Sequence, residues 1–221
     1  MAPNAYLFGA EFTRESTRIQ QEQRFKESVD RLEQEVERNA ASRARNVISS
    51  EDADSLKAEA ENQRAMIARL RTLRPTGRVV LELPEDAGEK DLPNIELEDG
   101  DRLMVPARLS MVSVFGAVYN EAAFIYRPEK RVADYLTQAG GATRTADTGS
   151  TYVLRADGSV ISKRESGLFW NSLDRARLMP GDAIVVPEDF DRTTFTRNLK
   201  DWTQLLYQFG LGAAAIKILR Q

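Results

Sequence analysis

The longest uniform stretch of the sequence extends from residue 15 to residue 74 and contains no glycine, proline, tryptophan or tyrosine. It is rich in Glu, Arg, Gln and Ala, which are all compatible with a helix interior. Because glycine and proline are the residues that interrupt helices, this stretch predicts helix for nearly its whole length.

Apolar residues recur within this stretch at spacings of three and four, which is typical of the seam of a coiled coil. The two series are Phe25, Val29, Leu32 and Val36, and then Leu56, Ala60, Gln63, Ile67 and Leu70. Between them, Ser49 and Ser50 precede two acids, as at the start of a helix. We therefore predict a hairpin of helices 15–46 and 50–73. Its mixed charges are typical of a structural arm, and a partner-binding surface is the alternative.

After residue 75 the pattern changes to short runs of β-forming residues separated by turn residues. A short helix is predicted between Lys130 and Gly140, with the pair Gly140-Gly141 as its end. A small sheet with one packed helix predicts an α+β fold. The expected strands are Val79–Leu83, Arg102–Val105, Met111–Val118, Phe124–Tyr126, Thr151–Arg155, Ser159–Ser162 and Ala183–Val186.

Two stretches, residues 97–106 and 178–187, have similar sequences. Each has Leu at its start, a Gly-Asp pair (Gly100-Asp101 and Gly181-Asp182), a short apolar run and a closing proline. We align the two Gly-Asp pairs and allow a single slip before the proline. Glycine suits the turn because it accepts a positive φ, and proline ends strand pairing because it has no amide donor. An internal repeat is favoured over a coincidence of two common turns.

Residues 10–14 stand before the first Gly-Asp turn as residues 151–155 stand before the second. In the second case a short turn follows, and in the first the helical hairpin follows. The hairpin is therefore interpreted as an insertion at a β-turn, a place where added chain is tolerated. The predicted organisation is a partial first unit (1–14 and 75–110), the hairpin (15–74), a second unit (111–190) and a C-terminal amphipathic helix (195–221).

The composition narrows the range of functions. The chain has no histidine and no cysteine, which removes the commonest general base, the usual zinc ligands, thiol nucleophiles and disulfides. Its 31 basic and 34 acidic residues give a net charge of -3, which disfavours nucleic acid as a partner. If the chain were a glycosidase, Asp99, Asp101 and Asp182 would be the candidate catalytic acids. Acids beside glycine, however, usually cap turns. We predict no enzyme, cofactor or metal site.

Residues 112–186 resemble the SLBB (soluble-ligand-binding β-grasp) module of bacterial outer-membrane polysaccharide export proteins. The resemblance depends on four motifs, with one departure: the family's Asn-Pro-Gly turn is here Asn120-Glu121-Ala122. The resemblance implies that this part of the chain is built from β-grasp-like units. The motifs are Ser113-Val-Phe-Gly116-Ala-Val-Tyr-Asn120, Val132-Ala-Asp-Tyr-Leu-Thr-Gln-Ala-Gly140-Gly141, Tyr152-Val-Leu-Arg-Ala-Asp-Gly158 and Pro180-Gly181-Asp182.

Export proteins of this kind form rings around a sugar-conducting cavity in the periplasm and outer membrane of Gram-negative bacteria. The resemblance thus implies polysaccharide, further copies of the chain and an inner-membrane export protein as partners. The first residues, however, lack the basic and apolar regions of a secretory signal. Family members also begin with an export domain, so we interpret the chain as truncated at its N-terminus.

Apolar residues near the C-terminus again follow helical spacing, and 205–216 holds one strongly polar residue, Gln208. We predict that this helix contacts the outer membrane or neighbouring subunits through Trp202, Leu206, Phe209 and Ile216. A core helix packed on the β-rich part is the alternative.

A soluble periplasmic carbohydrate-binding adaptor is the competing function. It needs only a β-grasp surface with exposed aromatic side chains that stack on sugars. Tyr119, Tyr126 and Trp170 are the candidates, although each of them is more commonly a core residue.

Overall fold

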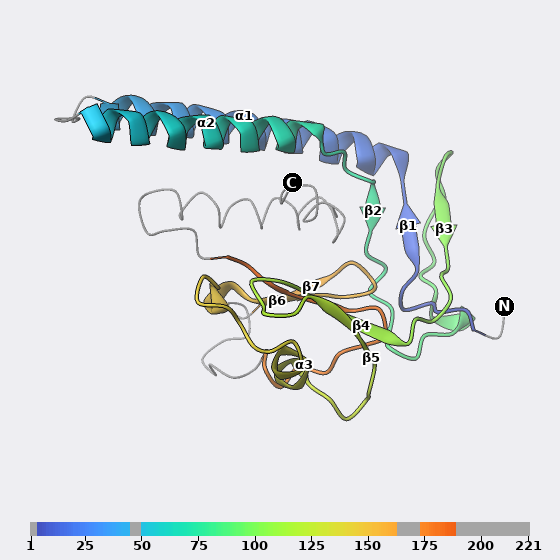
Figure 1. Ribbon diagram of the computed structural model, residues 1–221. Helices are drawn as coiled ribbons and strands as arrows, with labels where there is room; N and C mark the ends of the chain where they lie inside the picture. Colours follow the sequence, from blue (N-terminus) through green and yellow to red (C-terminus); the bar gives the residue numbers. More distant parts are fainter. Residues whose placement is uncertain (1–3, 45–49, 163–172, 189–221) are drawn as a thin grey trace. The chain divides into compact units, whose positions relative to one another are not determined.

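The computed structural model describes residues 4–44, 50–162 and 173–188 (Figure 1). This part of the chain divides into two compact units. One contains residues 16–77, and the other contains residues 4–15 together with 78–188. We describe each unit by itself.

The first of these units is a pair of helices, α1 (Glu15–Ala44) and α2 (Ser50–Thr72), that lie side by side (Figure 1). The predicted seam of α1 is confirmed, because Phe25, Val29, Leu32 and Val36 are its buried residues. Ile67 and Leu70 are buried on α2. Near the end of α2, Arg71 binds Asp30 and Glu33 of α1 with N···O distances of 2.7 and 2.6 Å. Residues 45–49, which the prediction divided between the end of the first helix and the start of the second, lie outside the described residues.

The second unit contains two sheets, and its elements make the fold α+β, as predicted. The three-stranded sheet has the order β2-β1-β3, with every pairing antiparallel. The five-stranded sheet has the order β5-β4-β8-β6-β7, in which only β4 and β8 are parallel. The strands are β1 (Glu11–Thr13), β2 (Arg78–Val79), β3 (Arg102–Met104), β4 (Met111–Gly116), β5 (Ala122–Ile125), β6 (Tyr152–Leu154), β7 (Val160–Ser162) and β8 (Ala183–Val186).

The seven predicted strand positions are all occupied, but several strands are shorter than predicted. The largest error is at 79–83, where β2 ends at Val79. Glu82 has φ +52°, a conformation that interrupts an extended strand, and Pro84 follows soon after. The run that begins at Met111 ends at Gly116 rather than Val118, because Gly116 has φ +98°. Two short 3-10 helices, Glu89–Asp91 and Thr148–Ser150, had no prediction.

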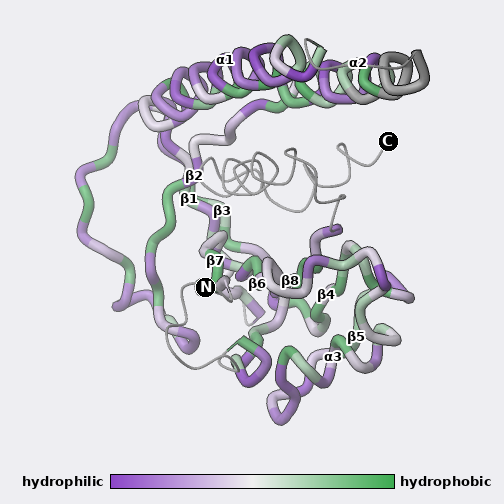
Figure 2. Tube along the Cα trace, turned by 90° about the vertical axis from the view of Figure 1, so that its left-hand side faces the viewer, coloured by the Kyte–Doolittle hydropathy of each residue, from purple (hydrophilic) through white to green (hydrophobic). Residues whose placement is uncertain are grey.

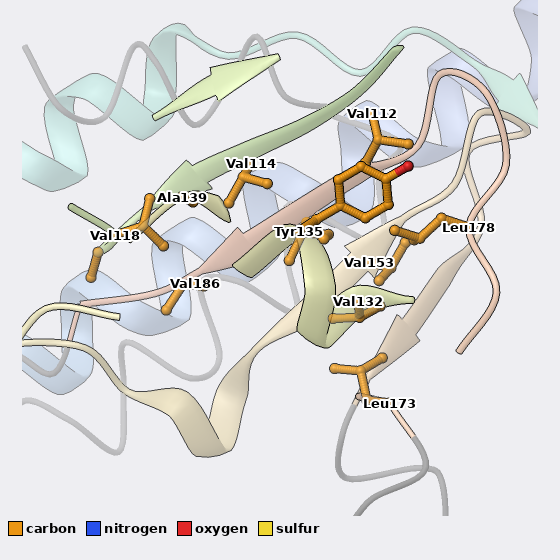
Figure 3. Packing of buried hydrophobic residues seen from close by; sticks show 12 residues of the cluster. Val112, Val114, Val118, Val132, Tyr135, Ala139, Val153, Leu173, Leu178 and Val186 are labelled. Carbon is orange, nitrogen blue, oxygen red and sulfur yellow. The ribbon is translucent and has the colours of Figure 1, made fainter. Parts of the chain in front are cut away.

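One helix, α3 (Val132–Gln138), packs on the five-stranded sheet and ends at the predicted glycine pair. Gly140 and Gly141 both have φ +82°, and the N–H of Gly141 donates to the carbonyl of Leu136 at 2.9 Å. The core between α3 and the sheet is shown in Figure 3. Strands β4 and β8 are correspondingly hydrophobic in Figure 2, whereas α1 is largely hydrophilic. The buried core residues are Val112, Val114, Ala117, Val118, Val132, Tyr135, Ala139, Val153, Leu173, Leu178, Ile184 and Val186.

The two sheets repeat the same three-stranded pattern. In the first sheet β3 pairs with β1, which pairs with β2, and in the second β8 pairs with β6, which pairs with β7. The registers agree as well: Phe12 lies opposite Leu103, as Val153 lies opposite Ile184. The slip allowed in the sequence alignment was wrong, because Pro106 and Pro187 stand equally far after their Gly-Asp pairs.

The connection between the outer two strands differs between the two sheets. Between β6 and β7 the chain makes a tight turn, in which the N–H of Gly158 donates to the carbonyl of Arg155 at 3.0 Å. Between β1 and β2, at the equivalent place, the chain forms the α1–α2 hairpin. This is the position at which an insertion was predicted.

Candidate functional site

The two Gly-Asp turns have the same backbone geometry. Gly100 and Gly181 have φ +86° and +89°, so each position favours glycine. In each turn the aspartate carboxylate accepts a hydrogen bond from the backbone N–H three residues earlier. The N···O distance is 2.8 Å from Glu98 to Asp101 and 2.7 Å from Met179 to Asp182. Both acids therefore cap turns.

Each aspartate also faces an arginine that directly follows the neighbouring strand. Arg14, after β1, donates to both carboxylate oxygens of Asp101 at 3.0 and 2.8 Å. Arg155, after β6, places its Nε 3.3 Å from Oδ2 of Asp182. The repeat therefore includes an ion pair between the strand end and the turn.

The surroundings of the two pairs differ in burial. The pair around Asp101 is partly exposed and lies among other acids, since Arg14 also binds Glu98 at 3.0 Å. Its hydrogen bonds with Arg14 lower the pKa of Asp101 below its ordinary value. Asp182 is fully buried, and this burial raises its pKa from 3.8 to about 6 despite the opposing effect of Arg155.

An apolar cluster covers the second turn. Tyr6 and Phe8, from the segment before β1, pack with Met179 and with partly buried Ala156. The guanidinium of Arg155 lies 5.2 Å from the centre of the Phe8 ring, at cation–π distance. The segment before β1 thus fixes the side chain that neutralises Asp182.

These contacts decide what the nominated acids can do. Asp101 and Asp182 are held by backbone N–H groups and arginine and sit in separate sheets, so they are not a carboxylate pair across a cleft. Asp99 lies in the first of these turns, directly before Gly100. Across residues 4–44, 50–162 and 173–188, no three acidic side chains are grouped closely enough to hold a metal ion.

Of the three aromatic candidates for sugar contact, Tyr119 is the exposed one, with 69% of its surface accessible. Its backbone N–H donates to the carbonyl of Gly141 at 3.2 Å, and its Cβ would lie 3.0 Å from a Cβ at Gly140. A side chain at position 140 would therefore crowd Tyr119, and the glycine leaves room for it. Tyr126 is partly buried against the core, and Trp170 lies outside the described residues.

The turn that departs from the family pattern closes through a side chain. The carboxylate of Glu121 accepts a hydrogen bond from the backbone N–H of Gly116 at 2.8 Å. This bond joins the end of β4 to the start of β5. The bond therefore closes the turn at Asn120-Glu121-Ala122 without a proline or a glycine in those three positions.

The predicted contact residues of the C-terminal helix, Trp202, Leu206, Phe209 and Ile216, lie outside the described residues. No helix that the structure describes has the length and apolar character to cross a membrane.

Sequence reasoning gave no role to Arg14 and Arg155, although the alignment of 10–14 with 151–155 placed them in equivalent positions. A signal was present in the sequence: an arginine at the end of the aligned segments 10–14 and 151–155, each repeated with a Gly-Asp turn. Arginine is the residue best suited to pair with a carboxylate that is removed from water.

No family model matches the chain. Two curated proteins from Escherichia coli, each named polysialic acid transport protein KpsD, are similar to it. Each is 29% identical over 196 residues, which is 88% of this chain and 32% of the relative. The chain thus spans about a third of the length of the curated relatives it matches. By name these relatives are transport proteins for polysialic acid.

Proposed function

We propose that this chain is a component of an apparatus that exports a capsular or extracellular polysaccharide, to which it contributes SLBB modules. The observation that carries the proposal is the similarity to the polysialic acid transport proteins, which extends over 88% of the chain. The repeated strand–turn pattern and the single helix packed on the five-stranded sheet support an assignment to the β-grasp-like module. In this role the chain catalyses no reaction and acts as a scaffold beside the polymer.

The proposed setting is the periplasm and outer membrane of a Gram-negative bacterium. There the chain forms a homo-oligomer, meets an inner-membrane export protein, and reaches the outer membrane through residues 195–221. The proposed contact side chains are Trp202, Leu206, Phe209 and Ile216.

The direct test is export in the bacterium that carries this chain. Deletion of its gene should abolish surface polysaccharide while polymer accumulates inside the cell, and the wild-type gene should restore export. Val114→Asp, in the fully buried core, should fail to restore it, whereas Val80→Asp, at an exposed site outside the strands, should succeed. Normal surface polysaccharide in the deletion strain would contradict the proposal.

The alternative function is a soluble periplasmic carbohydrate-binding adaptor without a membrane-inserted helix. Its supporting observation is the exposed Tyr119 ring on the loop between β4 and β5, since an aromatic face can stack on the apolar face of a sugar. Purified chain should then bind polysialic acid or another bacterial polysaccharide directly. Tyr119→Ala should weaken that binding by about tenfold, and Tyr119→Phe should keep it.

Removal of residues 199–221 separates the two functions. An export-ring component should need detergent as the full chain and become a smaller, soluble species after the deletion. An adaptor should be monomeric without detergent in both forms. Sedimentation velocity with and without detergent distinguishes these outcomes.

A further inference from the structure

Within the part of the chain that the structure describes, the three-stranded sheet lacks the neighbouring strand and packed helix that its counterpart in the five-stranded sheet has. The equivalent positions are set by the shared register of β3 and β8. Leu97 is 71% exposed where Leu178 is 2% exposed, and Leu103 is 47% exposed where Ile184 is fully buried. The same positions of one repeat therefore form core in one sheet and open surface in the other.

In the five-stranded sheet this core is completed by the residues that precede β6. Strand β4 runs parallel to β8, with Val114 opposite Ile184. Helix α3 then packs over the same face, where Val132 and Tyr135 are fully buried (Figure 3). A strand, a second strand and a helix thus cover Leu178 and Ile184.

In the three-stranded sheet the corresponding edge of β3 has no neighbouring strand among the described residues, because β3 ends the strand order. A free strand edge presents unpaired N–H and C=O groups that can accept another strand. Here the free edge adjoins exposed leucines, and exposed apolar side chains beside an open edge are characteristic of an interaction surface.

We propose that the free edge of β3, together with Leu97 and Leu103, accepts a strand–strand–helix segment supplied by polypeptide outside residues 1–221. Its first strand pairs with β3 in parallel and places an apolar residue opposite Leu103, as Val114 lies opposite Ile184. Its helix lays an apolar face on Leu97 and Leu103. The binding mode is strand addition to the edge of β3, combined with burial of the exposed Leu97 and Leu103 under a helix.

The source of the segment follows from chain order and from length. In the second repeat, β4, β5 and α3 precede β6, so the corresponding segment belongs before β1. The curated relatives are about three times as long as the matched region, which leaves ample polypeptide to supply it. A second copy of this chain is a poorer donor, because giving up its own β4 would expose Val112 and Val114. The proposal does not depend on the polysaccharide, and its failure would leave the export proposal intact.

The experiment supplies the segment in cis. A copy of residues 109–151 is fused ahead of residue 1 through a flexible Gly/Ser linker of about 20 residues, which holds it at an effective concentration of about millimolar. The control fusion carries Val112→Asp and Val114→Asp in the added copy only. Hydrogen exchange of the backbone amides of residues 101–105 is measured in both fusions and in the unfused chain.

The first fusion should slow exchange at 101–105 by about tenfold or more relative to the control fusion. Leu103→Asp in the first fusion should restore fast exchange. Equal exchange in the two fusions would overturn the proposal. Protection already present in the unfused chain and rising with its concentration would also overturn it, because a second copy would then occupy the edge.

Discussion

Asp101 and Asp182 hold equivalent places in two repeated turns, and their pKa values move in opposite directions. Each accepts a hydrogen bond from the backbone N–H three residues earlier and faces an arginine at a strand end. Asp101 is 5% exposed and receives hydrogen bonds from Arg14 on both of its oxygens, which lower its pKa. Asp182 is fully buried beside Met179, and this burial outweighs the effect of Arg155 and raises its pKa. The same local geometry therefore gives two different responses to pH.

Asp182 should make the free energy of unfolding fall as pH rises. Its folded pKa is about 6 and its ordinary value is 3.8, so the folded state binds the proton more tightly than the unfolded state. The stabilisation is fully present below about pH 4 and is lost as pH rises through about 6. A difference of about two pKa units corresponds to about 3 kcal/mol.

Urea unfolding of the wild-type chain and of Asp182→Asn between pH 4 and pH 7 measures this effect. The wild type should lose about 3 kcal/mol relative to the variant across that interval. Asp101→Asn is the matched control. Because the folded pKa of Asp101 is lowered, its difference from the wild type should stay flat between pH 4 and pH 7, and the wild type should lose stability relative to this variant only below about pH 4. A pH-independent difference between wild type and Asp182→Asn would contradict the assignment.

The two arginines should contribute unequally to stability. Arg155→Ala leaves a fully buried carboxylate without its cationic partner, and such changes cost about 3–5 kcal/mol. Arg14→Ala breaks a part-buried pair in which Arg14 is 20% exposed, so water can reach the position that Arg14 leaves and we expect a smaller loss. Chemical denaturation of both variants at pH 7 tests the order. Equal losses would show that burial does not separate the two repeats.

The sequence predicted the hairpin seam well because its contacts follow a short, regular spacing. Phe25, Val29, Leu32 and Val36 are buried as expected, since a helix brings such residues onto one face regardless of the rest of the fold. The position of β8 was likewise predicted in full, because a Gly-Asp turn and a proline mark both of its ends.

Features that depend on distant segments were not predictable in the same way. The Arg14–Asp101 pair joins residues 87 positions apart, and no local pattern fixes that distance. The parallel pairing of β4 with β8 depends on the chain crossing over through α3, β6 and β7. The predicted strand 79–83 could not have extended through Glu82, whose positive φ a glutamate rarely adopts and the sequence does not indicate.

Gly116 should tolerate no side chain. A Cβ at this position would lie 2.0 Å from the carbonyl oxygen of Val186, and φ is +98°. Gly116→Ala must therefore push β4 and β8 apart where they pair, and we expect a loss of more than about 4 kcal/mol. Gly141 has a similar φ of +82° but open space around it, so Gly141→Ala should cost about 1–2 kcal/mol. Thermal unfolding of the two variants separates the effect of the close contact with Val186 from the effect of the positive φ. Similar melting temperatures would contradict the close contact at Gly116.

The helical hairpin should unfold without the β-rich unit when its seam is broken. Leu32 is a buried residue of the α1 seam, so Leu32→Asp places a charge in an apolar environment and should cost at least about 3 kcal/mol. Ile19 is an exposed residue of the same helix, and Ile19→Asp should leave the helices intact. Far-ultraviolet circular dichroism reports the loss of helix, and limited proteolysis should cleave within residues 16–77 of Leu32→Asp while sparing residues 78–162. Unchanged helical signal in Leu32→Asp would show that the buried seam does not hold the two helices together.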